Sequence, residues 1–415
     1  MLSLFQLIAV LLTVTAGFAW VNHRVLRLPA NIGLLIIGLT ASLLMIAVEL
    51  LMPRTEVYSA LLRTLRQIDF YEAVMHGVLA FLLFAGALHV DVDRLRERGA
   101  VVALLATVGV ALSTVLAAAG IWAVANAASL PVSFSWALVF GALIAPTDPV
   151  AVLGILKAVN VPQSLETDMT GEALFNDGVG VVLFAVLLEA AAGGQGFGAG
   201  RVAAYLFVEA FGGAALGLAA GYLTYRAMRS IDDYSVEVML TLALVSGTYA
   251  LATALHMSGP IAVVVAGVLT GNRGAMKAMS ATTKRYVFGF WTLVDDILNA
   301  ILFLLIGLEV LVLSFDRSFL WLALLAPPLA VAVRLIAVGG SVKLMQRWHR
   351  FERGTVPILT WGAIRGGISI ALALSLPDVP ARPSILAATY SIVIFTVIVQ
   401  GLSLAFVIRR SRAPA

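Results

Sequence analysis

Long apolar runs separated by short polar loops make up this sequence from one end to the other. A helix that crosses a membrane needs about 20 largely apolar residues, and on that measure the pattern predicts about thirteen spans. The first run has neither a basic start nor a cleavage site, so we predict a membrane span and not a removable signal. The approximate limits of the predicted spans are 2–21, 30–51, 69–90, 100–126, 134–156, 169–193, 202–228, 236–255, 258–272, 288–313, 318–342, 356–377 and 383–408.

The composition supports this membrane class. The chain is 61% hydrophobic and 12% charged, whereas soluble domains have about a quarter charged residues. We therefore expect an all-α polytopic membrane protein in a lipid bilayer. The net charge is +4, in short basic runs, and does not favour nucleic-acid binding. The absence of cysteine excludes disulfides and thiol chemistry, and the five histidines have no metal-ligand spacing.

Lysine and arginine residues gather in alternate loops. Because basic residues concentrate in the cytoplasmic loops of membrane proteins, this bias predicts an N-terminus outside, a C-terminus in the cytoplasm and an odd number of spans. We expect multiple spans in a bacterial or archaeal-type plasma (inner) membrane.

Two of the predicted helices are interrupted. In segment 134–156, Pro146 and Pro149 flank Thr147 and Asp148, and each proline removes a backbone donor and breaks the helix. Segment 356–377 is interrupted at Arg365, which two glycines follow. A membrane tolerates broken helices where they line a cavity or are buried in protein.

The two interruptions occupy matching places. If residues 194–235 form a linker helix, residues 1–193 and 236–415 form two halves of opposite topology, with the broken helix fifth in each half. Paired interruptions of this kind are typical of inverted-repeat transporters that bind their substrate near the middle of the membrane.

Segment 169–193 has polar residues where they are costly: Glu172, Asn176 and Asp177. An ionisable residue deep in a span is a functional candidate by default. A buried carboxylate without a cationic partner holds a proton unless a cation replaces it. Since Na⁺ is a hard ion that prefers oxygen ligands, Asp177 alone can couple the fluxes of H⁺ and Na⁺ by competition. No cofactor is required.

Glu172 needs a partner if it stays ionised, and Arg365 in the other broken helix is the candidate. We predict a Glu172–Arg365 ion pair. Asp177 is then the only group that titrates, and one proton exchanges for one monovalent cation without net charge movement. Asn176 keeps this balance because it is neutral.

The break near Asp148 offers further polar groups. Helix N-termini have a partial positive charge, so Asp148 is stabilised where the half-helices meet; it is either structural or hydrogen-bonded to the Asn176 amide. The backbone carbonyl of Thr147, freed by the break, is a candidate ion ligand.

Several stretches resemble the NhaP-type sodium/proton antiporters of the cation/proton antiporter superfamily. These are APTDPVAV, GEALFNDGVG, LLFAGALHVDVDRL, LFLLIGLEV and WGAIRGGISIALALSLP, and the resemblance covers nearly the whole chain. It implies a homodimer in which a six-helix ion-binding core moves against a dimerisation domain in an elevator-like cycle.

The resemblance also implies a role for each matching residue. Asp177 is the carrier of ion and proton, Glu172 is a ligand or the partner of the arginine, and Arg365 is at the family's intramembrane arginine position. Asn176 orients the site, Thr147 gives a carbonyl and Asp148 stabilises the break, so the Na⁺ ligands are Asp177, Glu172 and Thr147. Many relatives have a serine where this chain has Ala173, which leaves the choice among Na⁺, Li⁺ and K⁺ open.

The sequence leaves alternatives open. A K⁺/H⁺ exchanger is the nearest; an organic-anion carrier should lack the buried carboxylate. A cation channel should have a repeated filter sequence, and an enzyme should have a nucleophile or metal motif, neither of which is present. Asp295, Asp296 and Asn299 fit either a cytoplasmic funnel or a polar helix start, and Glu309 has no assigned role.

Overall fold

The computed structural model describes residues 3–51, 70–148, 161–193, 199–312 and 319–412, together with residues 152, 155, 156 and 159. In this part of the chain the regular structure is all helical. Pro149, one of the two prolines expected to break the fifth span, lies outside the described residues. The α-helices are α1 (Leu4–Val21), α2 (Ala30–Leu51), α4 (Phe70–Glu72), α5 (Leu79–Leu88), α6 (Val92–Leu104), α7 (Val110–Ala127), α8 (Phe134–Ile144), α10 (Gln163–Ala191), α11 (Ala199–Met228), α12 (Tyr234–Ala254), α13 (Gly259–Leu269), α14 (Ala275–Lys277), α15 (Ala281–Glu309), α16 (Leu320–Met345), α17 (Thr355–Trp361), α18 (Gly367–Leu374), α19 (Arg382–Phe395) and α20 (Gly401–Arg412).

Short stretches of wider or tighter helix join several of these. The wider turns, with π-helical hydrogen bonding, are η1 (Asn22–Leu26), η2 (Ala73–Val78), η3 (Leu105–Gly109), η4 (Thr270–Gly274) and η7 (Thr396–Gln400), and η5 (Val310–Val312) is a 3₁₀ turn. Because η2, η3 and η7 connect helices without a loop, the chain runs on as one helical segment through each of them.

Each of the thirteen predicted spans contains helix in the described residues, so the all-α prediction is confirmed. Ten helical segments of the described chain are long and apolar enough to cross a membrane. The other three predicted spans contain shorter helices: α8 has 11 residues, α13 has 11, and the pair α17 and α18 has seven and eight. The predicted boundary between the eighth and ninth spans lies where α12 ends and α13 begins.

Polar side chains begin several of the helices. Ser258 accepts a hydrogen bond from the backbone of Ile261 at the start of α13, where Pro260 occupies the first turn without losing a helical hydrogen bond. Asp233 caps α12 and Ser280 caps α15 in the same way. These caps satisfy amides that would otherwise lack acceptors, which explains why the chain turns at these points.

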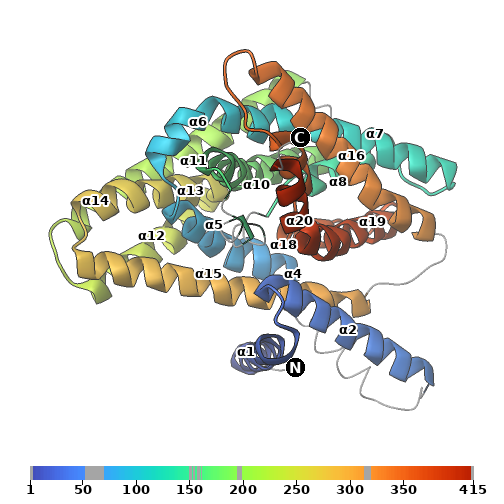
Figure 1. Cartoon of the computed structure of the whole chain (residues 1–415), viewed down its shortest axis with the longest axis horizontal. Coiled ribbons are helices and arrows are strands. Elements are labelled where there is room, and N and C mark those ends of the chain that lie inside the picture. Colours follow the sequence, from blue (N-terminus) through green and yellow to red (C-terminus); the bar gives the residue numbers. More distant parts are fainter. Residues whose placement is uncertain are drawn as a thin grey trace.

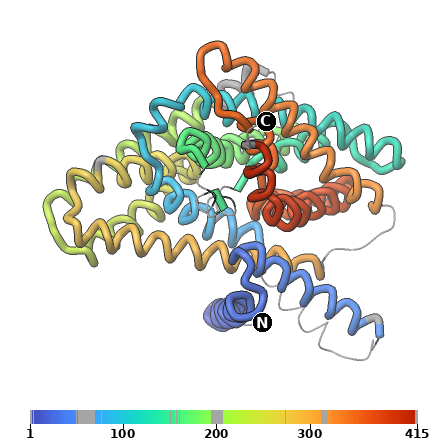
Figure 2. Tube along the Cα trace, in the orientation of Figure 1, coloured from blue at the N-terminus to red at the C-terminus, as the bar shows by residue number. Residues whose placement is uncertain are grey.

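The helices form two groups that meet at the centre of the molecule. In Figure 1, α10 is seen nearly end-on near the middle, α15 runs along one side of it, and α1 and α2 lie beyond α15. Helices α7, α8, α10, α16 and α19 pack against one another in one group, and α5, α11, α12, α13 and α15 in the other. The tube trace in Figure 2 shows the non-helical connections that lie between the groups near this centre.

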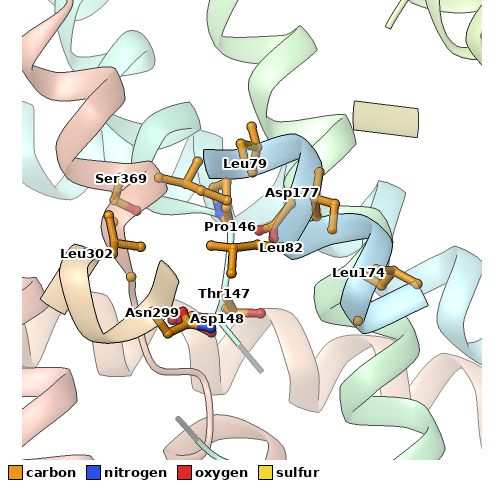
Figure 3. Close-up of a pocket in the computed structure, with 15 residues that line it drawn as sticks. Leu79, Leu82, Pro146, Thr147, Asp148, Leu174, Asp177, Asn299, Leu302 and Ser369 are labelled. Carbon is orange, nitrogen blue, oxygen red and sulfur yellow. The ribbon is translucent and has the colours of Figure 1, made fainter. Parts of the chain in front are cut away.

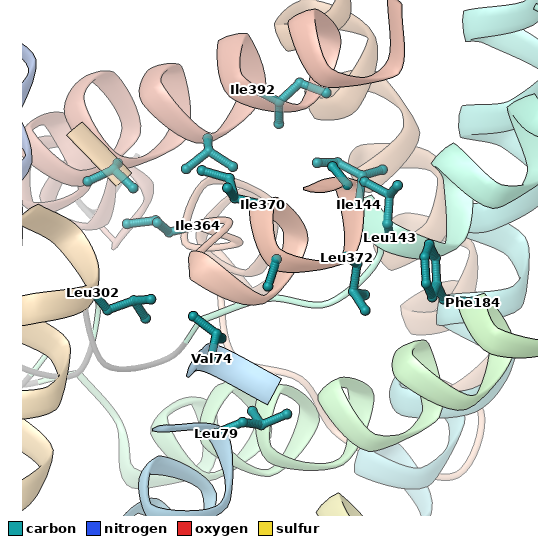
Figure 4. Packing of buried hydrophobic residues seen from close by; sticks show 14 of the residues in the cluster. Val74, Leu79, Leu143, Ile144, Phe184, Leu302, Ile364, Ile370, Leu372 and Ile392 are labelled. Carbon is teal, nitrogen blue, oxygen red and sulfur yellow. The ribbon is translucent and has the colours of Figure 1, made fainter. Parts of the chain in front are cut away.

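The interior is apolar, and so is much of the outer surface. Figure 4 shows buried aliphatic side chains around the broken helix of α17 and α18, among them Ile364, Ile370 and Leu302. On the outside, Phe5 is 80% exposed and Leu223 is 72% exposed. A soluble protein rarely exposes so many large apolar side chains, whereas a surface that faces lipid is expected to do so.

Candidate ion-binding site

Both predicted helix breaks are present, and they touch. Helix α8 ends at Ile144 and the chain is not helical at Pro146, Thr147 and Asp148. In the other half, α17 ends at Trp361 and α18 begins at Gly367, and residues 363–366 between them belong to neither helix. The backbone N–H of Asp148 donates to the carbonyl of Ile364 at 2.8 Å. Each break therefore satisfies a backbone group of the other, as a buried membrane site requires.

Glycines let the chain pack closely at this crossing. A Cβ added at Gly366 would lie 2.7 Å from the Oδ2 atom of Asp148 and 2.9 Å from its Cβ. A Cβ at Gly180 of α10 would lie 2.4 Å from Cγ of Pro146. Real side chains do not approach so closely, so any larger residue at either place would push the two breaks, or α10, away from the crossing.

Helix α10 brings the predicted polar residues against the first break. Glu172, Asn176 and Asp177 are all buried, and Asn176 pairs with Thr147. Its amide nitrogen donates to the Thr147 hydroxyl at 2.8 Å, and its carbonyl oxygen accepts from the Thr147 backbone N–H at 3.4 Å. Asn176 thus binds the break through Thr147, and its role in orienting the site stays a prediction.

Asp177 faces a cavity of about 60 Å³ between the two groups of helices. Thr147 and Asp148 from the first break, Gly366 from the second, and Asn299 of α15 line the same cavity (Figure 3). Leu79, Leu82 and Leu83 of α5 cover one side with apolar surface. Of the residues that line this cavity, Thr147, Asp148 and Asp177 were predicted site residues, whereas the leucines that face them were not.

Two buried oxygen atoms at this cavity have no hydrogen-bond partner among the described residues: Oδ1 of Asp177 and Oγ of Ser369. Asp177 is 5% exposed and Ser369 is 1% exposed. Leaving a buried polar oxygen unpaired is costly, so these atoms are positions where a proton or a cation would be stabilising. Sequence reasoning missed Ser369; its place just after the second break was the available signal.

The predicted ion pair between Glu172 and Arg365 is wrong. Arg334 of α16 donates from its two terminal nitrogens to the two carboxylate oxygens of Glu172, with the Nη2–Oε2 distance at 2.7 Å. Arg334 lies inside the predicted span 318–342, as Arg365 lies inside 356–377. Sequence position placed Arg365 in the paired break, but which of the two helices faces Glu172 depends on packing that spacing does not reveal.

Arg365 is 4% exposed and points elsewhere. Its Nη1 atom donates to the carbonyl of Ala363 at 3.2 Å, its backbone N–H donates to the Thr396 hydroxyl at 3.1 Å, and its Nε atom has no hydrogen-bond partner among the described residues. It lines a small cavity of about 10 Å³ with residues of α7, α8 and α16. Its positive charge lies near enough to interact with both Glu172 and Asp177 without a hydrogen bond to either.

Glu172 and Asp177 line different cavities. A second cavity of about 10 Å³ is bordered by Glu172, Ala173 and Arg334 on one side and by Thr147 and Asp148 on the other. Ala173 therefore lines the cavity of the Glu172–Arg334 pair and does not line that of Asp177. Both oxygens of Glu172 are occupied by arginine nitrogens.

One more buried ion pair holds this group of helices together. Arg98 of α6 binds both oxygens of Asp168, which lies one turn before Glu172 on α10, with the Nε–Oδ1 distance at 2.8 Å. The Arg98 guanidinium also lies over the ring of Phe351, 5.3 Å from its centre. This pair was not predicted from the sequence; Asp168, an acid four residues before Glu172, was the available signal.

Comparisons with known proteins agree with this geometry. The sequence model of a family described as sodium/hydrogen exchanger, transmembrane, matches residues 8–410. The Na⁺/H⁺ antiporter NhaP of Pseudomonas aeruginosa is 44% identical over 98% of this chain and 97% of its own. The Na⁺/H⁺ antiporter NhaH of Halobacillus dabanensis is 36% identical over 93% of each chain. Among solved structures, the sodium proton antiporter MjNhaP1 of Methanocaldococcus jannaschii has the same fold, with a TM-score of 0.74 at 18% identity over 99% of this chain and 100% of that one.

Proposed function

Because this chain belongs to the sodium/hydrogen exchanger family, we propose that it exchanges Na⁺ or Li⁺ for H⁺ across a membrane, with Asp177 as the shared binding site. The family consists of transporters and not of enzymes. The observation that carries the proposal is the unpaired Oδ1 of Asp177, buried at a cavity between the two crossing breaks. A proton and a cation compete for this one carboxylate, so binding of either displaces the other.

The charges at the crossing support a one-for-one exchange. Three carboxylates (Asp148, Glu172 and Asp177) lie there with two arginines, Arg334 and Arg365. One additional positive charge makes the set neutral, and either H⁺ or a monovalent cation supplies it. The charge of the loaded core is then the same in both halves of the cycle, so a membrane voltage does no net work on it. This is our reason for proposing electroneutral exchange.

The ligands we propose for the cation are oxygens on the wall of the Asp177 cavity: the Asp177 carboxylate and the Thr147 carbonyl. Asn176 holds Thr147 in place through two hydrogen bonds. Asp148 stabilises the break, with its backbone N–H bound to Ile364. The structure favours the partner role for Glu172 over the ligand role, because Arg334 takes both of its oxygens.

We also propose the larger-scale behaviour that the breaks suggest. Residues 1–193 and 236–415 form inverted repeats around the linker helix 194–235, and the core group of helices, which carries Asp177, moves as an elevator against the second group, α5 with α11–α15. In this proposal the protein is a homodimer in the plasma (inner) membrane, with its N-terminus outside and its C-terminus in the cytoplasm, and it contributes to pH homeostasis.

The test uses purified protein in proteoliposomes with an imposed pH gradient and a pH-sensitive dye inside. Wild type should dissipate the gradient when Na⁺ or Li⁺ is added, and Asp177→Asn should not, because an amide neither ionises nor replaces a proton by a cation. The matched control is Glu309→Gln, which removes another buried acid of the spans, 7% exposed, away from the cavity. Exchange retained in Asp177→Asn would refute the proposal. A K⁺ arm of the same assay decides between Na⁺/H⁺ and K⁺/H⁺ exchange.

A further inference from the structure

On the wall of the ion cavity opposite α10 lies a polar residue that has no role in the proposed exchange. Asn299 lies on α15, is 2% exposed and lines the same cavity as Asp148 and Asp177. Figure 3 shows its side chain beside Leu302 of the same helix, on the side of the cavity across from Leu174. An uncharged amide in an otherwise leucine-rich wall is costly to bury unless its groups are bound.

The orientation of this amide is fixed by its neighbour Asp295. The Asn299 Nδ2 atom donates to the Asp295 backbone carbonyl and to the Asp295 carboxylate, each at 3.0 Å. Both partners are acceptors, so the NH₂ end of the amide must face them. An amide is planar, and its carbonyl oxygen therefore points away from Asp295. That oxygen accepts no hydrogen bond from any residue that the structure describes.

We propose that Oδ1 of Asn299 is a neutral ligand for the cation in the Asp177 cavity, and that Asp295 is the positioning residue that turns it toward the cavity. This inference rests on the proposed exchange function. A volume of about 60 Å³ exceeds the ~10–15 Å³ that a single water molecule needs, so the cavity has room for a cation with part of its water shell. The Asn299 oxygen replaces one of these waters and adds no charge, which preserves the one-for-one balance.

The first test replaces Asn299 by leucine, a side chain of similar shape without the oxygen. In the proteoliposome assay, the apparent KM for Na⁺ of Asn299→Leu should rise about tenfold, equivalent to ~1.4 kcal/mol of binding, while kcat stays within about twofold of wild type. Asn299→Gln, which keeps the amide on a longer stem, should recover part of the loss. An unchanged KM in Asn299→Leu would overturn the proposal.

The second test separates positioning from simple attraction of cations by negative charge. Asp295→Asn keeps an acceptor for the Asn299 amide and removes the charge, so its KM should stay near the wild-type value. Asp295→Ala removes the side-chain acceptor and should raise KM about three- to tenfold, on the scale of one lost hydrogen bond. The matched control is Asp296→Asn, because Asp296 is the neighbouring acid, is exposed and makes no hydrogen bond to Asn299.

The outcomes distinguish this inference from the exchange proposal. If wild type performs no Na⁺/H⁺ exchange, the proposed function fails. Suppose instead that wild type exchanges, that Asp177→Asn does not, and that Asp295→Asn and Asp296→Asn both raise KM as much as Asp295→Ala. The acids then attract cations by their charge alone, and the positioning role of Asp295 fails. A thermal unfolding curve for each variant identifies loss of fold, and the Asp295 series tests the proposal even if Asn299→Leu does not fold.

Discussion

Replacing Arg334 by methionine should be among the most destabilising single changes in the spans, because it strands Glu172. The Glu172 side chain is 2% exposed, and Arg334 binds both of its oxygens. Removing one member of a buried ion pair costs about 3–5 kcal/mol, since the remaining charge has no compensation. Methionine fills much of the volume of the arginine stem, so little of this cost should come from a cavity.

The double variant Glu172→Met/Arg334→Met provides the decisive comparison. Replacing a buried ion pair by apolar residues of similar volume is often neutral or stabilising, so the double variant should be more stable than Arg334→Met by about 2–4 kcal/mol. The measurement is denaturant unfolding of detergent-purified protein, followed by the fluorescence of its seven tryptophans. The same cycle built with Arg365→Met should give a smaller coupling to Glu172 than Arg334→Met gives, because Arg365 interacts with Glu172 only through space and not through hydrogen bonds.

Two results would refute this reasoning. Equal losses in Arg334→Met and in the double variant would mean that Glu172 does not depend on Arg334. A larger coupling of Glu172 to Arg365 than to Arg334 would restore the pairing expected from the sequence and would contradict the Glu172–Arg334 ion pair.

The remaining two predictions concern the crossing of the breaks and the charge carried by the cycle. Gly366→Ala should lower the exchange rate at least about tenfold, because its Cβ would lie 2.7 Å from the Asp148 carboxylate and such overpacking costs ~1–3 kcal/mol. The control is Gly340→Ala in α16, whose Cβ would meet nothing within 4 Å. Equal exchange rates in the two variants would contradict the close approach of the two breaks. A voltage set by valinomycin and a K⁺ gradient should change the initial rate of Na⁺/H⁺ exchange in proteoliposomes by less than about twofold, whereas a cycle that moved one charge would feel ~2.3 kcal/mol per 100 mV.

Much of the fold could be predicted because membrane insertion is decided locally. Each span is a run of apolar residues whose length matches the membrane, and this signal does not depend on which helices become neighbours. The two breaks were equally legible, since Pro146 and the glycines after Arg365 disrupt a helix wherever it packs. The acids of α10 stood out for the same reason, because a charge within an apolar run is costly in any arrangement.

The partners of those residues could not be predicted in this way. Glu172 faces Arg334 and not Arg365 because of where α16 and the second break lie relative to α10, and these positions follow from the packing of all the helices of this group together. Asn299 and Ser369 became part of the ion cavity only because α15 and α18 meet there.

The sequence by itself determined the spans, the two breaks and the acid that the exchange proposal uses, since each is a property of one short segment in a lipid environment. The tertiary structure decided which arginine neutralises Glu172, that the breaks bind each other through Asp148 and Ile364, and which oxygens share a cavity with Asp177. These depend on contacts between segments far apart in the sequence, such as Asp148 and Ile364, which are 216 residues apart (364 − 148). No local pattern encodes the distance between two such segments in space.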